Sequence, residues 1–365
     1  MNKIIIIGAG PIGCYLARLL KNQGLNPLII EEHKSIGRPI HCAGLVGKKV
    51  FDESKIDIPK DCIINTISGA VIYFEDEKIE VKRKEVAYII DRERFDKFLG
   101  ENLNILFETK FLGLEKNKSS FIIETDRGDF KSEIVIGADG ANSFVRNILR
   151  NTNSIKLLRG VQFRMRFRPI YKDLVEVYIK KPYFYWIIPE SDNVVRVGVI
   201  SENPYYDLLN FIEERKLKKV DIIEKFAGIV PIEYFTPIQD EKLFLVGDSA
   251  SQIKPLTYGG IYMGMRGAEI LLDCIIKEKF SNYTFLWFKR FGREIKIMYQ
   301  VREVLKSLDN REIKRLFLFA KDKIKLIEEK ADFENHSTIL LEILKNPFIS
   351  KDILNIFLKI LKLNF

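Results

Sequence analysis

The chain has 365 residues, of which 59 are Lys or Arg and 50 are Asp or Glu, so its formal net charge is +9; 47% of the residues are hydrophobic. This composition excludes a disordered chain, and the length excludes a small fold that depends on disulfides. At about 100 to 200 residues per domain, we expect two or three lobes that can enclose a ligand.

The cysteines and the N-terminus favour a cytoplasmic protein. No CxxC pair is present, which argues against a disulfide framework and against a zinc or iron–sulfur site. Glycines follow Ile4–Ile7 directly, so we expect no signal peptide. The uncharged stretch 4–17 is shorter than the roughly 20 residues of a membrane-spanning helix. We expect reduced thiols at all four cysteines, which are Cys14, Cys42, Cys62 and Cys274.

The excess of basic residues leaves several partners open. A nucleic acid, an anionic lipid surface and an acidic protein are all compatible with it, and so is an ordinary solvated surface on which Lys and Glu alternate. The chain shows no nucleic-acid-binding motif and no basic cluster interleaved with aromatic residues. We therefore expect no nucleic-acid partner.

The first elements of the chain predict a βαβ unit. Lys3–Ile7 is an apolar run typical of a strand buried on both faces, a helix follows to Lys21, and Asn26–Ile30 is the next buried strand. Short alternating stretches at 70–74, 78–81 and 87–90 predict an antiparallel sheet, and 91–99 predicts a helix.

A second lobe is predicted farther along. Residues 159–168 alternate between apolar side chains and Gln or Arg, and strands follow at 174–179, 184–188 and 194–200. Buried strands at 134–136 and 243–246, with a helix at 261–277, return the chain to the first lobe. From Tyr283 onward the spacing predicts helices.

The sequence between the first strand and helix carries a nucleotide-binding signal. Gly8, Gly10 and Gly13 form GxGxxG, and Glu31 ends the next strand, 18 residues after Gly13. Gly8 permits a tight turn, Gly10 lets the backbone approach a pyrophosphate, and Gly13 lets the helix pack closely on the sheet. The helix N-terminus attracts phosphates, and Glu31 can accept hydrogen bonds from the adenosine ribose.

Later motifs favour FAD over NAD, because extended FAD needs contacts beyond the first βαβ unit. Gly247-Asp248 ends a late strand, and Thr257–Gly260 precedes a long helix that starts near Ile261. Asp248 can accept a hydrogen bond from a ribityl hydroxyl. The positive end of the helix can stabilise the reduced flavin ring by about 0.3 to 2 kcal/mol.

These elements define an α/β fold of mixed α+β character. We expect a discontinuous, Rossmann-like FAD-binding domain at 1–69, 92–155 and 240–280. An antiparallel-sheet substrate domain is expected at 70–91 and 156–239, and a helical C-terminal region at 281–365.

Four separated motifs resemble the geranylgeranyl reductase family of flavoproteins, within the group built like para-hydroxybenzoate hydroxylase. They are GxGxxG with Glu31, the segment Gly37–Leu45, the segment Gly137–Ser143, and Val246–Ala250 continuing to Gly259-Gly260-Ile261. The aromatic strand Pro182–Pro189 also resembles the family's substrate-site motif. The resemblance extends from residue 1 to about residue 300.

The resemblance implies roles for particular residues. Tyr185 and Trp186 match the substrate pocket, and Cys42 matches a position near the flavin ring. Arg92 matches an arginine near the FAD phosphates, and Phe111 is a weaker match for an adenine contact. The implied cofactor contacts are Ile12, Glu31, Arg38, Cys42, Ala43, Leu45, Arg92, Asp139, Gly140, Gly247, Asp248, Gly259, Gly260 and Ile261.

Two departures from the family pattern bear on substrate shape. Tyr258-Gly259-Gly260 stands where the family has three glycines, and Ile188 replaces a Phe before the final Pro. Structural readings of the site residues also remain open. Tyr185 and Trp186 point to opposite faces of a strand, so at least one can be a core residue, and Cys42 can be a small buried filler.

The resemblance implies an FAD-dependent reductase that saturates isolated double bonds of geranylgeranyl chains in archaeal-type membrane lipids or their precursors. The substrate would be a polyprenyl lipid or a prenyl diphosphate, and the reduced electron donor ferredoxin or NAD(P)H. A proton must reach the second alkene carbon, and Cys42 or an ordered water is the candidate donor. A flavin monooxygenase or halogenase, and a flavoprotein that only relays electrons or binds lipid, remain as alternatives.

The C-terminal residues suggest a contact with membranes. Residues 350–365 combine a broad apolar face with a narrow basic stripe, and the predicted helix is too short to span a bilayer. It can lie in the membrane interface on the cytoplasmic side, or it can pack on the protein core.

Overall fold

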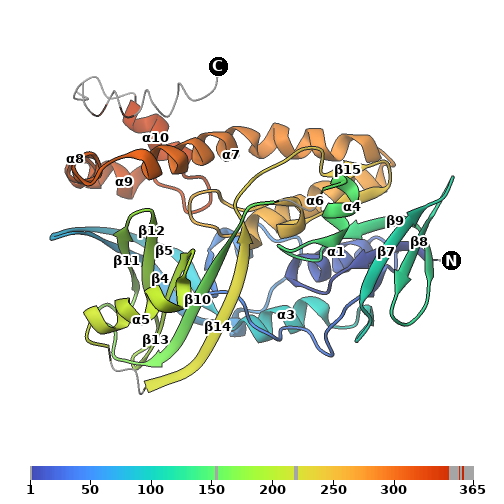
Figure 1. Cartoon of the computed structure of the whole chain (residues 1–365), viewed down its shortest axis with the longest axis horizontal. Helices are drawn as coiled ribbons and strands as arrows, with labels where there is room; N and C mark the ends of the chain where they lie inside the picture. Colours follow the sequence, from blue (N-terminus) through green and yellow to red (C-terminus); the bar gives the residue numbers. More distant parts are fainter. Residues whose placement is uncertain (1, 153–154, 218–220, 345–352, 354–355, 357–365) are drawn as a thin grey trace.

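Two β-sheets form the body of the molecule, and helices from the C-terminal third lie along one side of both sheets (Figure 1). The computed structural model describes residues 2–152, 155–217, 221–344, 353 and 356. Each sheet has eight strands and takes segments from several parts of the chain. The mixed α/β class predicted from the sequence is confirmed.

The first sheet has a core of parallel strands in the order β16-β9-β1-β2-β6. The residues at its centre, 4–7, 28–30 and 134–136, are apolar and buried, as expected for parallel strands covered on both faces. The short strand β15 extends one edge, and the β7–β8 hairpin pairs with β9. The bounds are β1 (Asn2–Ile7), β2 (Leu28–Ile30), β6 (Asn104–Leu106), β7 (Phe111–Lys116), β8 (Phe121–Thr125), β9 (Phe130–Gly137), β15 (Gln239–Asp240) and β16 (Leu243–Leu245).

Helices follow the parallel strands at their carboxyl ends. Helix α1 (Pro11–Asn22) starts directly after the glycine-rich loop, with Gly10 as its N-cap. It packs against α3 (Arg92–Gly100) and α6 (Ile261–Ile276), while α4 (Phe144–Arg150) follows β9. The predicted N-terminal βαβ unit is therefore confirmed, and three separate parts of the chain meet at one edge of the sheet.

The second sheet has the order β14-β10-β13-β12-β11-β4-β5-β3. Strands β11 and β4 run parallel, whereas the other neighbouring pairs among the described residues are antiparallel. The bounds are β3 (Leu45–Gly47), β4 (Ile63–Phe74), β5 (Glu77–Ile90), β10 (Leu157–Arg166), β11 (Leu174–Lys180), β12 (Tyr183–Ser191), β13 (Val194–Ser201) and β14 (Ile222–Pro231).

The two faces of the second sheet have different surroundings. Helix α5 (Pro204–Glu214) covers one face, where Phe163 and Val197 pack with Phe211 in an apolar cluster. The opposite face carries Gln162, Trp186 and Arg196, and Arg196 reaches from it to the segment that precedes β3. The alternation predicted for residues 159–168 therefore separates a core face from a face turned toward the first sheet.

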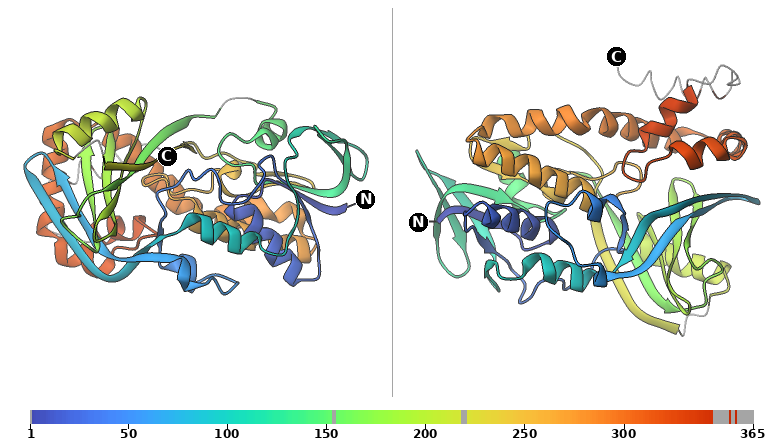
Figure 2. Two further views of the ribbon diagram at one scale, coloured as in Figure 1. Left: turned by 90° about the horizontal axis from the view of Figure 1, so that it is seen from below. Right: turned by 180° about the vertical axis from the view of Figure 1, so that it is seen from behind.

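Residues 283–344, the continuous described part of the region after Tyr283, are mostly helical, as predicted. Helix α7 (Tyr283–Ser307) lies beside α6 and continues past the second sheet (Figure 2). Three shorter helices follow, and Asp309 and Glu312 form a capping box at the start of α8. These helices are α8 (Asn310–Asp322), α9 (Ile324–Lys330) and α10 (Ser337–Leu344). Short helical turns elsewhere are α2 (Lys49–Asp52), η1 (Lys60–Cys62), η3 (Gly247–Ala250) and η4 (Phe280–Asn282).

The antiparallel pairing predicted for residues 70–90 is confirmed, but the stretches 78–81 and 87–90 belong to one strand and not to two. The structure has two long strands, β4 and β5, that form a hairpin, and both continue through register shifts that interrupt the simple alternation. The second sheet also begins earlier in the chain than predicted, because β3 and the first residues of β4 belong to it. Pairing partners distant in the sequence decide these boundaries.

The predicted interfacial helix at 350–365 lies almost entirely outside the described residues. Of this segment, Ile353 and Ile356 are described, and both are buried in a cluster with Met298 and Phe317. None of the helices within the described ranges is long and apolar enough to span a bilayer. The four cysteines are all described and are free thiols.

Candidate functional site

The glycine-rich loop after β1 is shaped by two close backbone approaches. Gly8 has φ +103°, and a Cβ at this position would lie 2.5 Å from the Ala138 carbonyl oxygen. A Cβ at Gly13 would overlap the Gly8 carbonyl, so only glycine lets α1 pack this closely. At Gly10, by contrast, a Cβ would meet nothing within 4 Å. Close packing explains why glycine is required at positions 8 and 13, whereas Gly10 leaves open space at the N-terminus of α1.

Glu31 connects the end of β2 to this loop. Its Oε2 atom accepts a hydrogen bond from the Ala9 amide at 2.6 Å, and its Oε1 atom accepts one from the His33 amide at 2.9 Å. The His33 ring lies 2.6 Å from the same Oε1 atom. The Oε2 atom has one hydrogen bond here and can accept another, so the position remains suitable for a ribose hydroxyl.

The Asp139-Gly140 motif lies at the end of β9, next to the glycine-rich loop. The Asp139 carboxylate accepts hydrogen bonds from the Ser143 hydroxyl and from the amides of Phe144 and Val145, and thereby caps α4. Burial raises the pKa of Asp139, although these hydrogen bonds oppose the shift. Gly140 has φ +76° and open space at its Cβ position. In this structure the Asp139 carboxylate therefore stabilises the turn into α4.

Arg146 was not identified from the sequence. Its side chain is buried, and its Nη2 atom donates to the Ala141 carbonyl, while Nε and Nη1 have no hydrogen-bond partner in the structure. Burial lowers the pKa of Arg146, and the charges of Asp139 and Asp248 act against this shift. A buried cation with two unused donors indicates room for an acceptor such as a phosphate or hydroxyl.

Arg92, Cys42 and Asp248 converge from three different segments. Arg92 forms a bidentate ion pair with Asp96, with Nη2 2.9 Å from Oδ2. Burial opposes the charge of Arg92, but Asp96 and then Cys42 outweigh burial and raise its pKa. Asp248 keeps some exposed surface, and desolvation by the surrounding protein raises its pKa to about 6 against the opposing charges of Arg92 and Arg146.

The late Gly-Asp motif packs directly on α1. A Cβ at Gly247, which has φ +73°, would lie 3.2 Å from Ile12, and one at Gly264 in α6 would lie 2.7 Å from Ile12. A Cβ at Gly260 would lie 2.6 Å from Asp248 Oδ1. The predicted positions Ile12, Gly247, Asp248, Gly260 and Ile261 are therefore brought together at the N-terminus of α6.

Tyr258 occupies one of the positions where the sequence departs from the family pattern. It has φ +61°, a backbone conformation that favours glycine. Its ring stacks on Phe184 of β12, with ring centroids 6.2 Å apart and planes at 6°. Gly259 and Tyr258 therefore link the start of α6 to the second sheet.

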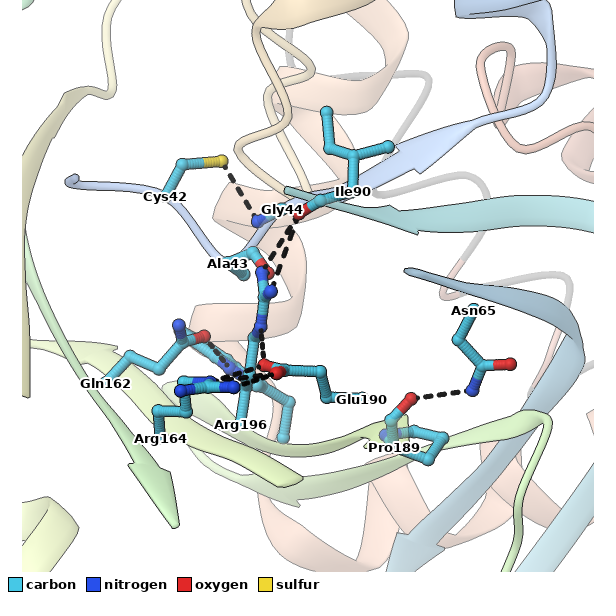
Figure 3. Close-up of polar contacts among 11 residues, drawn as sticks. Cys42, Ala43, Gly44, Asn65, Ile90, Gln162, Arg164, Pro189, Glu190 and Arg196 are labelled. Carbon is cyan, nitrogen blue, oxygen red and sulfur yellow. Dashed lines mark hydrogen bonds and ion pairs between the residues drawn. The ribbon is translucent and has the colours of Figure 1, made fainter. Parts of the chain in front are cut away.

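The segment Cys42–Gly44 is clamped to the second sheet (Figure 3). Arg196 donates from Nη1 to the Ala43 carbonyl at 2.6 Å, and its Nε atom donates to Glu190 Oε2 at 2.8 Å. Arg164 makes a bidentate pair with the same Glu190. Burial works against ionisation of Glu190, yet the two arginines hold its pKa below the usual value. Cys42 Sγ accepts a hydrogen bond from the Gly44 amide at 3.3 Å.

Trp186 and Tyr185 lie on opposite faces of β12. Tyr185 is buried against Phe211 of α5, with ring centroids 4.7 Å apart. Trp186 lies over Gly198, where a Cβ would overlap the indole ring, and its Nε1 atom donates to Gln162 Oε1 at 3.0 Å. Trp186 belongs to an apolar cluster with Ala43, Leu45, Val177, Ile188 and Phe333. Of the two aromatic residues, Trp186 is on the face of the Cys42 segment.

Two predicted cofactor residues lie at the edge of this region. Arg38 is half-exposed and pairs with Glu93 at 2.8 Å and with Glu224 at 2.9 Å, and these hydrogen bonds raise its pKa. Phe111, at the start of β7, packs edge-on against Phe144 with centroids 5.7 Å apart. The residues missed by the sequence analysis, besides Arg146, are Gln162, Arg164, Glu190 and Arg196. The alternation of residues 159–168 placed two of them on one face but could not show what that face contacts.

The residues fit an extended dinucleotide with a long polar chain. Gly10 leaves space at the positive end of α1, Arg146 offers unused buried donors, and Asp248 offers a carboxylate beside a second helix N-terminus. Together these features define the class of the protein as an FAD-dependent oxidoreductase.

Comparisons with known proteins agree with this class. A family model described as pyridine nucleotide-disulphide oxidoreductase matches residues 5–148. The uncharacterised protein MJ1520 of Methanocaldococcus jannaschii is 33% identical over 94% of this chain and 95% of its own length. Digeranylgeranylglycerophospholipid reductase 1 of Methanococcoides burtonii is 29% identical, covering 87% of each chain.

Solved structures show the same fold. The crystal structure of a geranylgeranyl bacteriochlorophyll reductase-like protein from Thermoplasma acidophilum has a TM-score of 0.81 at 23% identity, covering 97% of this chain and 98% of that one. PqsL of Pseudomonas aeruginosa, a probable FAD-dependent monooxygenase, has a TM-score of 0.69 at 14% identity, covering 87% of this chain and 99% of that one. The chain belongs to the same family as MJ1520, and along most of its length it is similar to proteins named as geranylgeranyl reductases.

Replacing Gly10→Val is expected to give a folded protein without FAD, because a Cβ there has no protein atom within 4 Å and the side chain extends into the space beside the helix N-terminus. Absorbance and circular dichroism of the purified variant measure FAD content and folding. Gly292→Ala, in α7, is the matched control, since a Cβ there has only ordinary contacts, the nearest at 3.5 Å. A yellow, fully flavinylated Gly10→Val protein would contradict the assignment of this loop.

Affinity for FAD is expected to fall by about tenfold or more as the pH drops through about 6, the value to which burial raises the pKa of Asp248. A ribityl hydroxyl donates to the ionised carboxylate, so FAD binding lowers the pKa of Asp248, and the gain in affinity is present above that range and lost below it. Calorimetric titration of the apoprotein with FAD at several pH values measures the effect. Asp248→Asn should remove this dependence; if the variant keeps it, another group is responsible.

Proposed function

We propose that the protein is a reductase that saturates isolated double bonds in the geranylgeranyl chains of archaeal-type membrane lipids or their precursors. The observation that carries this proposal is the apolar face around Trp186, which adjoins the Cys42–Gly44 segment of the cofactor edge. The name of the M. burtonii relative supports the choice of a prenyl lipid substrate.

An apolar cluster on the second sheet supports the choice of a polyprenyl chain as substrate. An isolated alkene offers no strong hydrogen-bonding group, so it is held by apolar contacts worth about 25 cal/mol for each Å² removed from water. The indole of Trp186 lies against Gly198, and Gln162 fixes its ring nitrogen, so the ring presents a rigid apolar surface. Leu45 and Phe333 are partly buried members of the same apolar cluster, and Ile188 is buried in it.

Bound FAD supplies the hydride chemistry that carbon–carbon double bonds require. The remaining requirement is a proton for the second alkene carbon. Cys42 is partly exposed, and the Gly44 amide and Arg196, which holds the Ala43 carbonyl, fix the backbone on which its sulfur is carried. We propose that Cys42 Sγ, or a water that it orients, holds this proton beside Trp186.

The substrate's origin and the electron donor complete the proposal. A polyprenyl lipid is drawn from a membrane, so we propose peripheral attachment at the cytoplasmic face, favoured by the net charge of +9. Either ferredoxin or NAD(P)H can serve as the reduced donor.

Mass spectrometry of lipids that copurify with the protein, followed by anaerobic turnover with dithionite-reduced enzyme, tests this function. We expect a bound prenyl lipid, and products whose mass rises by two hydrogen atoms for each double bond that is reduced. Fast oxygen consumption coupled to a hydroxylated or halogenated aromatic product would identify a monooxygenase or halogenase instead. Absence of any turnover with prenyl lipids would leave a flavoprotein that relays electrons or binds lipid.

Replacing Cys42→Ala is expected to slow alkene reduction by about 100-fold while the flavin spectrum stays nearly unchanged, because a positioned proton donor contributes rate and not cofactor affinity. Single-turnover rates measure the effect. Cys274→Ala removes a buried thiol of α6 and serves as the control. Unchanged turnover in Cys42→Ala would make Cys42 a packing residue.

Replacing Trp186→Ala is expected to lower kcat/KM for a prenyl substrate by about ten- to a hundredfold, since about 1.5 to 3 kcal/mol of apolar contact is lost. Trp186→Phe should recover much of that loss, because it keeps a flat apolar ring over Gly198. Steady-state kinetics of the two variants make the comparison. Equal values for Trp186→Ala and the parent would show that the substrate binds elsewhere.

A further inference from the structure

A buried ion pair lies behind the glycine loop that precedes α6. Lys254, in the segment between η3 and α6, has its Nζ atom 3.0 Å from Oε2 of Glu334, in the segment between α9 and α10. The two side chains are only 7% and 3% exposed. The C-terminal helical region therefore places a carboxylate beside the loop that leads into α6 and beside β3 of the second sheet.

The surroundings of the pair give it little hydrogen-bond support. Lys254 donates to the Phe333 carbonyl at 3.0 Å, and its ammonium lies 4.2 Å from the centre of the Phe333 ring. Neither carboxylate oxygen of Glu334 has a hydrogen-bond donor in good geometry, although Oε2 is in ionic contact with Lys254. A buried pair of this kind is a poor source of stability, because desolvation of both charges offsets their attraction.

The molecule makes room for this pair at two glycines. A Cβ at Gly47, in β3, would overlap Glu334 Oε1. At Gly259 a Cβ would lie 2.7 Å from Lys254 Cε and 3.3 Å from its Nζ. Lys254 also pairs with the loop through its backbone, since its amide donates to the Gly259 carbonyl at 3.0 Å. The ammonium is therefore in contact with the turn whose next residue, Gly260, caps α6.

Other ionisable groups near the pair have partners of their own. Asp332 pairs with Lys49 at 2.6 Å, and Glu294 accepts hydrogen bonds from the backbone amides of His336 and Ser337. Burial and then the charge of Lys254 lower the pKa of His336 to about 4, so this ring is neutral at pH 7. The charged side chain beside the glycine loop is that of Lys254, and Glu334 is its ionic partner.

We propose that Lys254 and Glu334 act on the reduction potential of the bound FAD in opposite directions, so that each offsets the other. The proposal rests on the FAD placement described above, with the flavin ring at Gly259-Gly260 and the N-terminus of α6. Uptake of two electrons and one proton leaves a reduced flavin with one negative charge, so a nearby cation favours the reduced form and a nearby anion disfavours it. Glu334 moderates the effect of Lys254, and it connects the C-terminal region to the redox chemistry.

Anaerobic dye-equilibrated titration of the FAD-loaded protein measures this effect without any prenyl substrate. Lys254→Met should lower the midpoint potential and Glu334→Gln should raise it. Each shift should reach at least about 30 mV, which corresponds to a tenfold change in the ratio of reduced to oxidised flavin for a two-electron couple. The double variant should return close to the parent, because it restores neutrality.

Lys49→Met is the matched control, because it removes a cation that pairs with the same 331–337 segment but is 40% exposed and screened by solvent. It should leave the potential unchanged. If Lys254→Met fails to fold, Glu334→Gln alone decides, since it keeps the Lys254 contact with Phe333. Shifts of the same sign in both single variants, or none beyond that of Lys49→Met, would overturn the proposal. A parent protein that binds no FAD would instead refute the cofactor site, and absent prenyl turnover with normal potential shifts would refute only the proposed function.

Discussion

The arrangement of the site depends on one clamp between the two sheets. Arg196 holds the Ala43 carbonyl, and Glu190 holds Arg196 and Arg164 on the face of the second sheet (Figure 3). Without it, the Cys42–Gly44 segment would be a loop that crosses between sheets with little backbone pairing. Removing one partner of such a buried network leaves an unpaired charge, which costs about 3 to 5 kcal/mol. The clamp therefore fixes the distance between the cofactor edge and the apolar surface of Trp186.

Close helix packing defines the other side of the site. Ile12 fits between Gly247 and Gly264, so α1 and α6 approach at the edge where three parallel strands end. Both helix N-termini then point their unpaired amides toward the same region, which favours bound anions. Gly10 differs from these glycines because no protein atom fills the space beside it.

Buried charge distinguishes this region from an ordinary core. Arg146 has unused donors, Asp248 has a pKa raised by desolvation, and Glu334 lacks a hydrogen-bond donor. Interiors rarely keep such groups without a partner, because each costs free energy when desolvated. A charged, hydrogen-bonding cofactor explains Arg146 and Asp248, and we propose that Lys254 and Glu334, which pair with each other, adjust its redox properties.

The sequence by itself determined the βαβ unit, the glycine-rich loop, Glu31 and the two late glycine motifs, because each depends on local backbone geometry and on spacing along the chain. It also placed Gln162 and Arg164 on one face of a strand. The tertiary structure decided that Trp186, and not Tyr185, lies on the face of Cys42, since the position of α5 selects the core face. It also joined Arg196 to Ala43 and Lys254 to Glu334, contacts that span 153 residues in the first case and 80 in the second. No local pattern specifies such pairs, because the folding of both sheets and the helical region brings them together.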